Sequence, residues 1–166
     1  MTSSPKPFST KPDRTPSPPD YTFFTDRDLG AAVPRRLGQA GLAVQRHDDH
    51  FPQGTLDTDW YPKVGREGWL ALTHDKGQWR KTDERDAAMR AGVALFIIVG
   101  RMKHAALAEL VVAMAGKMRS FRERHRPPFI AKVYRRDPRL KTHLTLPGRI
   151  ELMLSLESWQ ERQKGR

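Results

Sequence analysis

From Tyr21 onward, short runs of β-branched and aromatic residues alternate along the chain with segments whose apolar residues recur at helical spacing. The continuous apolar run Val93–Val99 is typical of a strand buried on both faces. The segment from His104 to about Phe121 has the amphipathic pattern of a long helix. The same patterns predict further strands at residues 21–25, 42–44, 69–73 and 129–134, and further helices at residues 31–40, 57–65 and 83–91.

Capping signals mark the ends of two of these helices. Gly41 suits the C-cap of the first helix, and Asp57 or Thr58 suits the N-cap of the second, which follows a polar loop at residues 47–56. The glycines between 65 and 68 are expected to end that second helix. Strands that alternate with helices over short connections are typical of an open, mostly parallel sheet, so we predict an α/β fold.

The two ends of the chain differ from this core. Residues 1–20 are mainly Pro, Ser, Thr and Lys, and we expect them to form a disordered tail. Residues 21–135 form the predicted domain, and residues 136–166 form a basic C-terminal extension. Within that extension, apolar residues at alternate positions between 150 and 156 suggest a strand, although the composition also permits a helix over 150–160. This segment could extend the sheet or dock on a partner.

Aspartates follow several of the predicted strands. Asp26 comes directly after the first strand and Asp75 directly after the strand at 69–73, while Asp48 and Asp49 follow the second strand and Asp57 and Asp59 open the next helix. Ligands of parallel α/β sheets bind at the carboxyl ends of the strands, where these side chains are expected to meet. The alternative roles are local: Asp57 and Asp59 as helix caps, and Asp48 and Asp49 as solvated loop residues.

The net charge adds a candidate substrate. Lys and Arg number 30 against 19 acidic residues, which gives a formal charge of +11 and favours contact with a polyanion such as nucleic acid. Clustered carboxylates repel one another unless a cation such as Mg²⁺ or Mn²⁺ neutralises them. An acidic, metal-holding edge within a basic protein suits an enzyme that cleaves phosphodiesters. The chain has no cysteine, no secretory signal and no apolar run of the roughly 20 residues that a membrane span needs, so we expect a cytoplasmic protein without membrane contact.

Five stretches, taken in order, resemble PIN-like ribonuclease domains, in particular the toxins of VapBC-type toxin–antitoxin systems. They are FFTDRDLG, VPRRLGQAGLAVQRHDDHF, DTDWYPKVGREGWLALTHDK, AAMRAGVALFIIV and PPFIAKVYR, and together they cover about residues 21–135. The resemblance implies a three-layer α/β/α fold with a mostly parallel sheet and an endoribonuclease that depends on Mg²⁺ or Mn²⁺. It also implies RNA as substrate and a cognate antitoxin as partner, and many relatives are homodimers.

The resemblance assigns the metal-binding acids one by one. The first acid of the family falls on Asp26, the second on Asp57 with Asp59 as the alternative, and the third on Asp75. Many PIN domains have a fourth acid shortly after the third, but the slot near Gly77 holds no acid.

Three residues could stand in for the missing acid. Asp83 and Glu84 are weak substitutes, and Asp28 could compensate from the first loop. The missing acid leaves open a catalytically inactive PIN-like module that binds RNA or protein. A nuclease acting on DNA is the other alternative, since backbone chemistry alone does not separate the two polymers.

Basic residues near the same edge are candidates for substrate binding. Lys76, Arg80 and Arg101 could each contact a substrate phosphate, and Trp79 is a candidate for stacking on a base. The HDDH cluster at residues 47–50 has the composition of a transition-metal site, but we interpret it as part of the polar loop.

Overall fold

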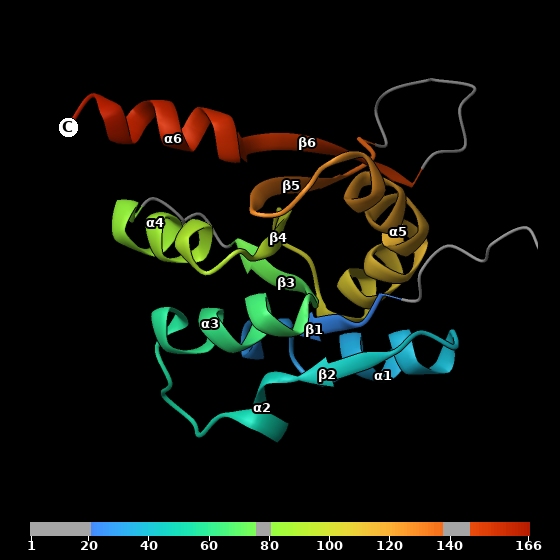
Figure 1. Ribbon diagram of the computed structural model, residues 1–166. Coiled ribbons are helices and arrows are strands. Elements are labelled where there is room, and N and C mark those ends of the chain that lie inside the picture. The colour runs from blue at the N-terminus through green and yellow to red at the C-terminus, as the bar shows by residue number, and fades with distance from the viewer. Residues whose placement is uncertain (1–20, 76–80, 138–146) are drawn as a thin grey trace, which may run out of the picture.

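A computed structural model describes residues 21–75, 81–137 and 147–166, with the backbone alone described at Asp75. These residues form one six-stranded sheet with the strand order β2-β1-β3-β4-β5-β6 (Figure 1). The first five strands are parallel and β6 is antiparallel to β5. The strands are β1 (Phe23–Thr25), β2 (Val44–Arg46), β3 (Leu70–Asp75), β4 (Ala94–Val99), β5 (Phe129–Arg135) and β6 (Gly148–Ser155).

Helices cover both faces of the sheet. They are α1 (Ala32–Gln39), α2 (His47–His50), α3 (Asp57–Glu67), α4 (Thr82–Arg90), α5 (His104–Arg124) and α6 (Leu156–Lys164), and a 3₁₀ turn, η1 (Arg27–Leu29), follows β1. Core residues of α1 and α5 pack on one face, and those of α3 and α4 pack on the other. The predicted three-layer α/β/α fold with a mostly parallel sheet is therefore confirmed.

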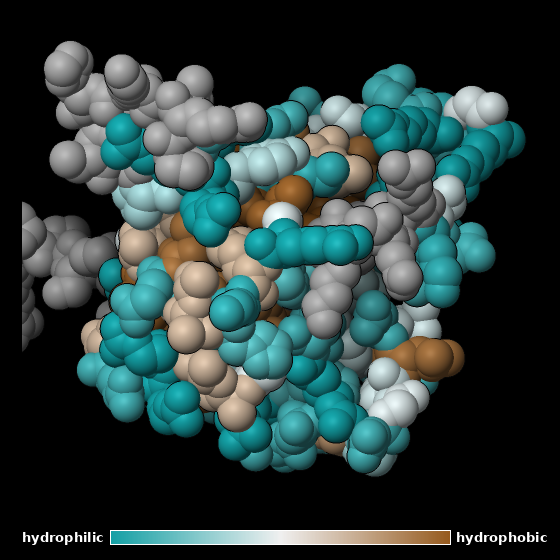
Figure 2. Space-filling model, turned by 180° about the vertical axis from the view of Figure 1, so that it is seen from behind, coloured by the Kyte–Doolittle hydropathy of each residue, from teal (hydrophilic) through white to brown (hydrophobic). Residues whose placement is uncertain are grey.

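The alternation of side chains along each strand divides the core between the two faces. Phe23 packs with α1 and α5, whereas its neighbour Phe24 packs with Trp60 and Val64 of α3. All residues of β4 from Ala94 to Ile98 are buried, as the continuous apolar run predicts. Outside this core, hydrophilic residues cover most of the face seen in Figure 2. Of the helices described, none combines the length and apolar composition that crossing a membrane requires.

The predicted elements are present, but several boundaries differ. The second strand begins at Val44 and not at Leu42, because the N–H of Leu42 donates to the carbonyl of Leu37 (3.1 Å) and closes α1. The expected C-cap, Gly41, lies one residue beyond the observed C-cap, Ala40. The first four residues of the expected polar loop form the short helix α2.

Helix α3 ends within the predicted range 65–68 but differs from the prediction in its N-cap. Its N-cap is Leu56, which has no capping side chain, so neither Asp57 nor Thr58 is the cap. The helix continues through Gly65 to Glu67 and is closed by Gly68 at φ +68°. Gly65 serves close packing instead, because a Cβ built there would lie 1.8 Å from the carbonyl oxygen of Ala91.

The C-terminal segment contains both of the expected alternatives. Strand β6 ends at Ser155, whose hydroxyl accepts a hydrogen bond from the N–H of Ser158 (3.1 Å) and so starts α6. Helix α6 lies on the same side of the molecule as α4 (Figure 1). The buried carboxylate of Asp86 joins the two helices. This carboxylate accepts hydrogen bonds from Trp159 Nε1 (2.9 Å), Gln163 Nε2 (3.4 Å) and Arg166 (3.1 Å). The tail predicted at residues 1–20 lies outside the described residues.

Candidate active site

Asp26 lies at the carboxyl end of β1, where the chain leaves the sheet. Its N–H donates to the carbonyl of Leu72 on the neighbouring strand β3 (3.0 Å). Its Oδ1 accepts from the N–H of Arg27 (2.7 Å), so Asp26 caps the 3₁₀ turn η1. Its Oδ2 accepts from the hydroxyl of Thr73 on β3 (3.0 Å). The carboxylate is therefore held at the end of the sheet by one donor from η1 and one from β3.

Asp28, two residues later in η1, turns back to the same point of β3. Its Oδ2 lies 3.1 Å from the Thr73 hydroxyl and accepts from the N–H of His74, also at 3.1 Å. A hydroxyl carries one hydrogen, so Thr73 can donate to Asp26 or to Asp28 but not to both at once. The other oxygen of Asp28, Oδ1, is buried and has no hydrogen-bond partner among the residues described. One buried carboxylate oxygen thus receives no hydrogen bond from the described residues.

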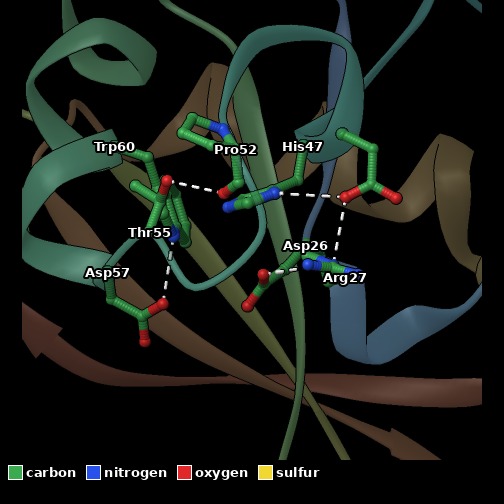
Figure 3. A network of polar contacts seen from close by, with 8 residues as sticks. Asp26, Arg27, His47, Pro52, Thr55, Asp57 and Trp60 are labelled. Carbon is green, nitrogen blue, oxygen red and sulfur yellow. Dashed lines mark hydrogen bonds and ion pairs between the residues drawn. The ribbon is translucent and has the colours of Figure 1, made fainter.

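Asp57 brings a third carboxylate to this edge from the first residue of α3. Its Oδ1 accepts from Trp60 Nε1 (3.0 Å), and Trp60 is fixed in the core with 1% of its surface exposed (Figure 3). The charge of Asp57 raises the pKa of Asp26 and of Asp28. Asp59, the sequence alternative for the second acid, is exposed on the same helix. The aspartate that faces the cluster is therefore Asp57.

Burial and mutual repulsion make these acids hold their protons. Burial raises the pKa of Asp28 to about 7, and the negative charge of Asp26 is the next largest cause. The pKa of Asp26 is also raised, first by burial and then by Asp57, although hydrogen bonds from Thr73 and Arg27 oppose the shift. Such a cluster is unfavourable while its members are ionised and unneutralised.

Glu84 on α4 is the fourth acid that approaches the cluster. Burial raises the pKa of the Tyr61 hydroxyl well above its usual value, and the charges of Asp57 and Glu84 are the next causes. Asp26 and Asp28 contribute to the same shift. Glu84 is partly buried, whereas its neighbour Asp83 is exposed. Of the two weak substitutes for the missing family acid, Glu84 is therefore the one near the cluster.

Asp75 is the last residue of β3 and pairs in register with Val99 of β4. Its backbone therefore reaches the same sheet edge as Asp26, as predicted. Its side chain and residues 76–80, which include Lys76, Trp79, Arg80 and the slot near Gly77, lie outside the description.

The carboxylate oxygens of Asp26, Asp28 and Asp57 are of the ligand type that hard cations prefer. Within the part of the chain that is described, which omits the Asp75 side chain, no three His, Cys, Asp or Glu residues are close enough to hold a metal ion. The unpartnered Oδ1 of Asp28 and the single hydrogen that Thr73 offers to two carboxylates nevertheless leave negative charge uncompensated. Oxygen ligands of this kind suit Mg²⁺ or Mn²⁺.

The family comparison covers the strands that carry these acids. Residues 21–100 match the family described as PIN-like domain. The chain contains a PIN-like domain. The match begins just before β1 and ends just after β4, so it includes Asp26, Asp28, Asp57 and Asp75. No curated protein and no solved structure matches the chain. Domains of this family have a nuclease-type fold.

The HDDH cluster of the PIN-like domain does not gather around one point. His47 is buried, with 2% of its surface exposed, whereas Asp48 and Asp49 are exposed. The ring of His50 instead meets the side chain of Gln45 (2.7 Å). Asp48 forms an ion pair with Arg27 at 3.1 Å. The four residues form a helical turn, α2, and the sequence alone shows neither this turn nor the burial of His47.

Arg101 lies beyond the carboxyl end of β4 and is exposed, as the sequence predicts. It lines a surface hollow of about 420 Å³ together with Tyr134, Arg135 and Arg136 from the end of β5. Sequence reasoning missed Arg135 at the end of β5 and Arg136 after it as site candidates, because only the sheet order puts β5 next to β4. This side of the PIN-like domain therefore combines basic residues from two neighbouring strands.

Proposed function

We propose that this protein is a metal-dependent endoribonuclease and the toxin component of a toxin–antitoxin pair. The observation that carries the proposal is the pair of carboxylates, Asp26 and Asp28, that share the single hydroxyl hydrogen of Thr73 at the carboxyl edge of a PIN-like domain. Asp57 lies beside them and raises the pKa of both. Acids from two separate segments, the turn after β1 and the start of α3, lie close enough to raise one another's pKa, which suits a cation site.

Under this proposal, Asp26, Asp28, Asp57 and Asp75 are the residues that would hold Mg²⁺ or Mn²⁺. A bound ion of this kind polarises a phosphoryl oxygen and lowers the pKa of an attacking water. The chain's own groups orient the ligands: Thr73 and the N–H of His74 hold Asp28, the N–H of Arg27 holds Asp26, and Trp60 holds Asp57. Glu84 acts on Tyr61 together with these acids, but the proposal does not assign it a role in binding the ion.

RNA binding is supported by the charge of the protein. Arg101 and Arg135 are exposed at the carboxyl ends of β4 and β5, next to the strand that ends at Asp75. Such residues bind the phosphate backbone without reading its sequence. Lys76 and Arg80 are proposed as further phosphate contacts. The preference for RNA over DNA and the antitoxin partner rest on the family resemblance alone.

Replacing Asp26 by Asn tests the proposed metal site. The change keeps the shape of the side chain and removes one of several mutually repelling charges, so metal-free stability should stay the same or rise slightly. Cleavage of single-stranded RNA in Mg²⁺ should fall by orders of magnitude, because the ion loses a charged ligand. The measurement pairs a thermal melt with a gel-based cleavage assay on the purified proteins, with single-stranded DNA as a parallel substrate.

Asp49→Asn is the matched control, because it removes the same charge from an exposed position on α2. It should cleave as fast as the wild type. Equal cleavage by Asp26→Asn and the wild type would exclude Asp26 as a metal ligand. A wild type that binds RNA and never cleaves it in Mg²⁺ or Mn²⁺ would favour the inactive binding module.

A further inference from the structure

A second hollow lies on the other side of Asp26 from the acid cluster. It has a volume of about 130 Å³, and it is lined by Thr25, Asp26, Arg27, Gly30, Ala31, Pro34, Arg46, His47 and Asp48. These residues come from the ends of β1 and β2 and from the starts of α1 and α2. The hollow therefore opens at the same carboxyl edge as the proposed metal site and shares one residue, Asp26, with it.

His47 is a buried group that lacks a hydrogen-bond partner in this hollow. It is 2% exposed, and its Nδ1 is buried with no hydrogen-bond partner among the described residues. That nitrogen lies 3.5 Å from Oδ1 of Asp48, an ion-pair distance whose geometry does not make a hydrogen bond. Figure 3 shows the ring beside Asp26 and Arg27. A buried polar atom left unsatisfied in this way costs free energy unless a ligand meets it.

The start of α1 adds backbone N–H donors beside the ring of His47. Gly30, Ala31 and Pro34 line the hollow, and no side chain among the described residues caps this helix. The first N–H groups of an α-helix have no partner within the helix and carry the positive end of its dipole. The N–H of Gly30 already donates to the carbonyl of Arg27 (3.0 Å) and Pro34 has no N–H. The backbone donors that this helix start can offer an anion are therefore those of Ala31, Ala32 and Val33.

The charges around the hollow divide into paired and unpaired groups. Asp48 is paired with Arg27 at 3.1 Å, and both oxygens of Asp26 accept hydrogen bonds, from the N–H of Arg27 and the hydroxyl of Thr73. Arg46 is exposed and has no ion pair within the ranges that the structure describes. The two carboxylates are thus engaged by the protein. The groups that remain for a ligand are the guanidinium of Arg46, the ring of His47, whose Nδ1 makes no hydrogen bond to Asp48, and the N-terminus of α1.

We propose that this hollow binds a phosphodiester group of the RNA strand, adjacent to the one held at the acid cluster. The inference rests on the proposed function in taking RNA as the ligand. Arg46 contacts the phosphate from the open side, and His47 and the first turn of α1 contact it from the inner side. The strand is thereby held on the β1–β2 side of the acids, opposite the arginines at the ends of β4 and β5.

The first experiment looks for the phosphate directly. The full chain, labelled with ¹⁵N and kept in EDTA, is titrated with dimethyl phosphate, a minimal phosphodiester, and followed by NMR. Saturable shifts are expected at the amides of Ala32 and Val33 and at the His47 ring, with binding weakened several-fold in Arg46→Gln. Shifts that do not saturate, that occur elsewhere, or that are the same in Arg46→Gln would overturn the proposal.

The second experiment measures how many phosphates the protein contacts on RNA. Binding of a fluorescent single-stranded RNA is followed in EDTA over a range of salt concentrations for the wild type, Arg46→Gln and Arg66→Gln. Each phosphate contact on a single strand contributes about 0.7 to the slope of log K against log salt, so Arg46→Gln should lower the slope by about that amount. Arg66 is an exposed arginine in the last turn of α3, which leads back to the start of β3, so Arg66→Gln should keep the wild-type slope. An unchanged slope in Arg46→Gln would refute the site.

His47 is tested by two variants, because the side chain is buried. His47→Asn keeps a polar atom near the position of Nδ1, and His47→Leu removes it. We expect Asn to retain more RNA affinity than Leu when thermal melts show both variants folded. Equal affinities in two folded variants would remove His47 from the site.

Failure of this inference and failure of the nuclease proposal can be distinguished. Every binding measurement is made in EDTA, so it does not depend on cleavage. A wild type that never cleaves RNA but shows the Arg46 effect would contradict the nuclease and support the phosphate site. A wild type that cleaves RNA while Arg46→Gln keeps the wild-type salt slope would support the nuclease and contradict the phosphate site.

Discussion

The hydroxyl of Thr73 has one hydrogen and faces two carboxylates, so the proton content of this small group depends on pH. Asp28, with a pKa near 7 in the folded protein, holds its proton more tightly there than at its ordinary value of 3.8. A group of this kind contributes stability that is fully present below about pH 4 and is lost as the pH rises through about 7. Metal-free protein should therefore become less stable across this window because of Asp28.

Replacing Asp28 by Asn removes this pH dependence. We expect the difference in unfolding free energy between the wild type and Asp28→Asn to change in favour of the variant from pH 4 to pH 7, by roughly 3 kcal/mol. The measurement is urea denaturation in EDTA at several pH values. Mg²⁺ that binds only the folded state stabilises it. At pH 7 it should stabilise the wild type more than the variant, because the variant lacks the Asp28 carboxylate as a ligand. A difference that stays constant with pH would contradict the raised pKa.

At the residue scale, the sequence predicts part of the acid cluster for a physical reason. Asp26 follows a strand directly, so its place at the sheet edge depends only on where that strand ends. Asp57 and Asp59 both open α3, and the side of the helix that faces the sheet decides between them. Glu84 approaches only because α4 packs beside α3. Such an approach depends on tertiary packing and has no local signal.

Helix α3 shows at the element scale how a glycine can be mistaken for a stop signal. Gly65 looks like a helix end in the sequence, yet it lies within α3 at the point where the helix meets the carbonyl of Ala91. The true stop is Gly68, whose positive φ closes the helix. The short helix α2 escaped prediction for a related reason, because four polar residues have no periodic pattern to read.

Gly65→Ala should destabilise the protein. The added Cβ would lie 1.8 Å from a backbone oxygen, so α3 and the end of α4 must move apart, at a cost of roughly 1–3 kcal/mol. Gly38→Ala is the matched control, since nothing lies within 4 Å of its Cβ and Ala favours a helix by up to about 1 kcal/mol. Chemical denaturation of both variants measures the contrast. A Gly65→Ala variant that is as stable as the wild type, or that gains stability as Gly38→Ala does, would show that the contact is not tight.

At the scale of the whole molecule, the C-terminal helix is held by one buried acid. Three donors of α6 and the residues after it converge on Asp86, and the pKa of its carboxyl is lowered, first by Trp159 and then also by Arg166. A lowered pKa contributes stability above about pH 4 that is lost as the pH falls further. The sequence predicts a strand or helix in this region, but the Asp86 contact spans more than 70 residues and depends on both elements being in place.

Asp86→Asn should loosen α6 and lower the unfolding free energy by about 1–3 kcal/mol at pH 7, because a buried charge-assisted hydrogen-bond set is broken. The effect should shrink as the pH falls below 4, because the folded wild type loses the charge of this carboxyl as the pH passes through its lowered pKa. Urea denaturation at pH 7 and pH 3 measures both. Glu157→Gln, at an exposed position of α6, should change stability little. An Asp86→Asn effect as small as that of the control would mean that α6 is held by other contacts.

The strand order has a consequence for how the protein is made. Each strand after β1 pairs with a strand that has already been synthesised: β2 and β3 with β1, β4 with β3, β5 with β4 and β6 with β5. Each strand can therefore pair as it is synthesised, because no later strand has to insert between two strands that are already paired. Limited proteolysis of ribosome-bound chains of increasing length should show protection of β1 and β3 before β6 emerges. The acids of the site would then be assembled while the ribosome is still adding the strand and helix that close the sheet at its far edge.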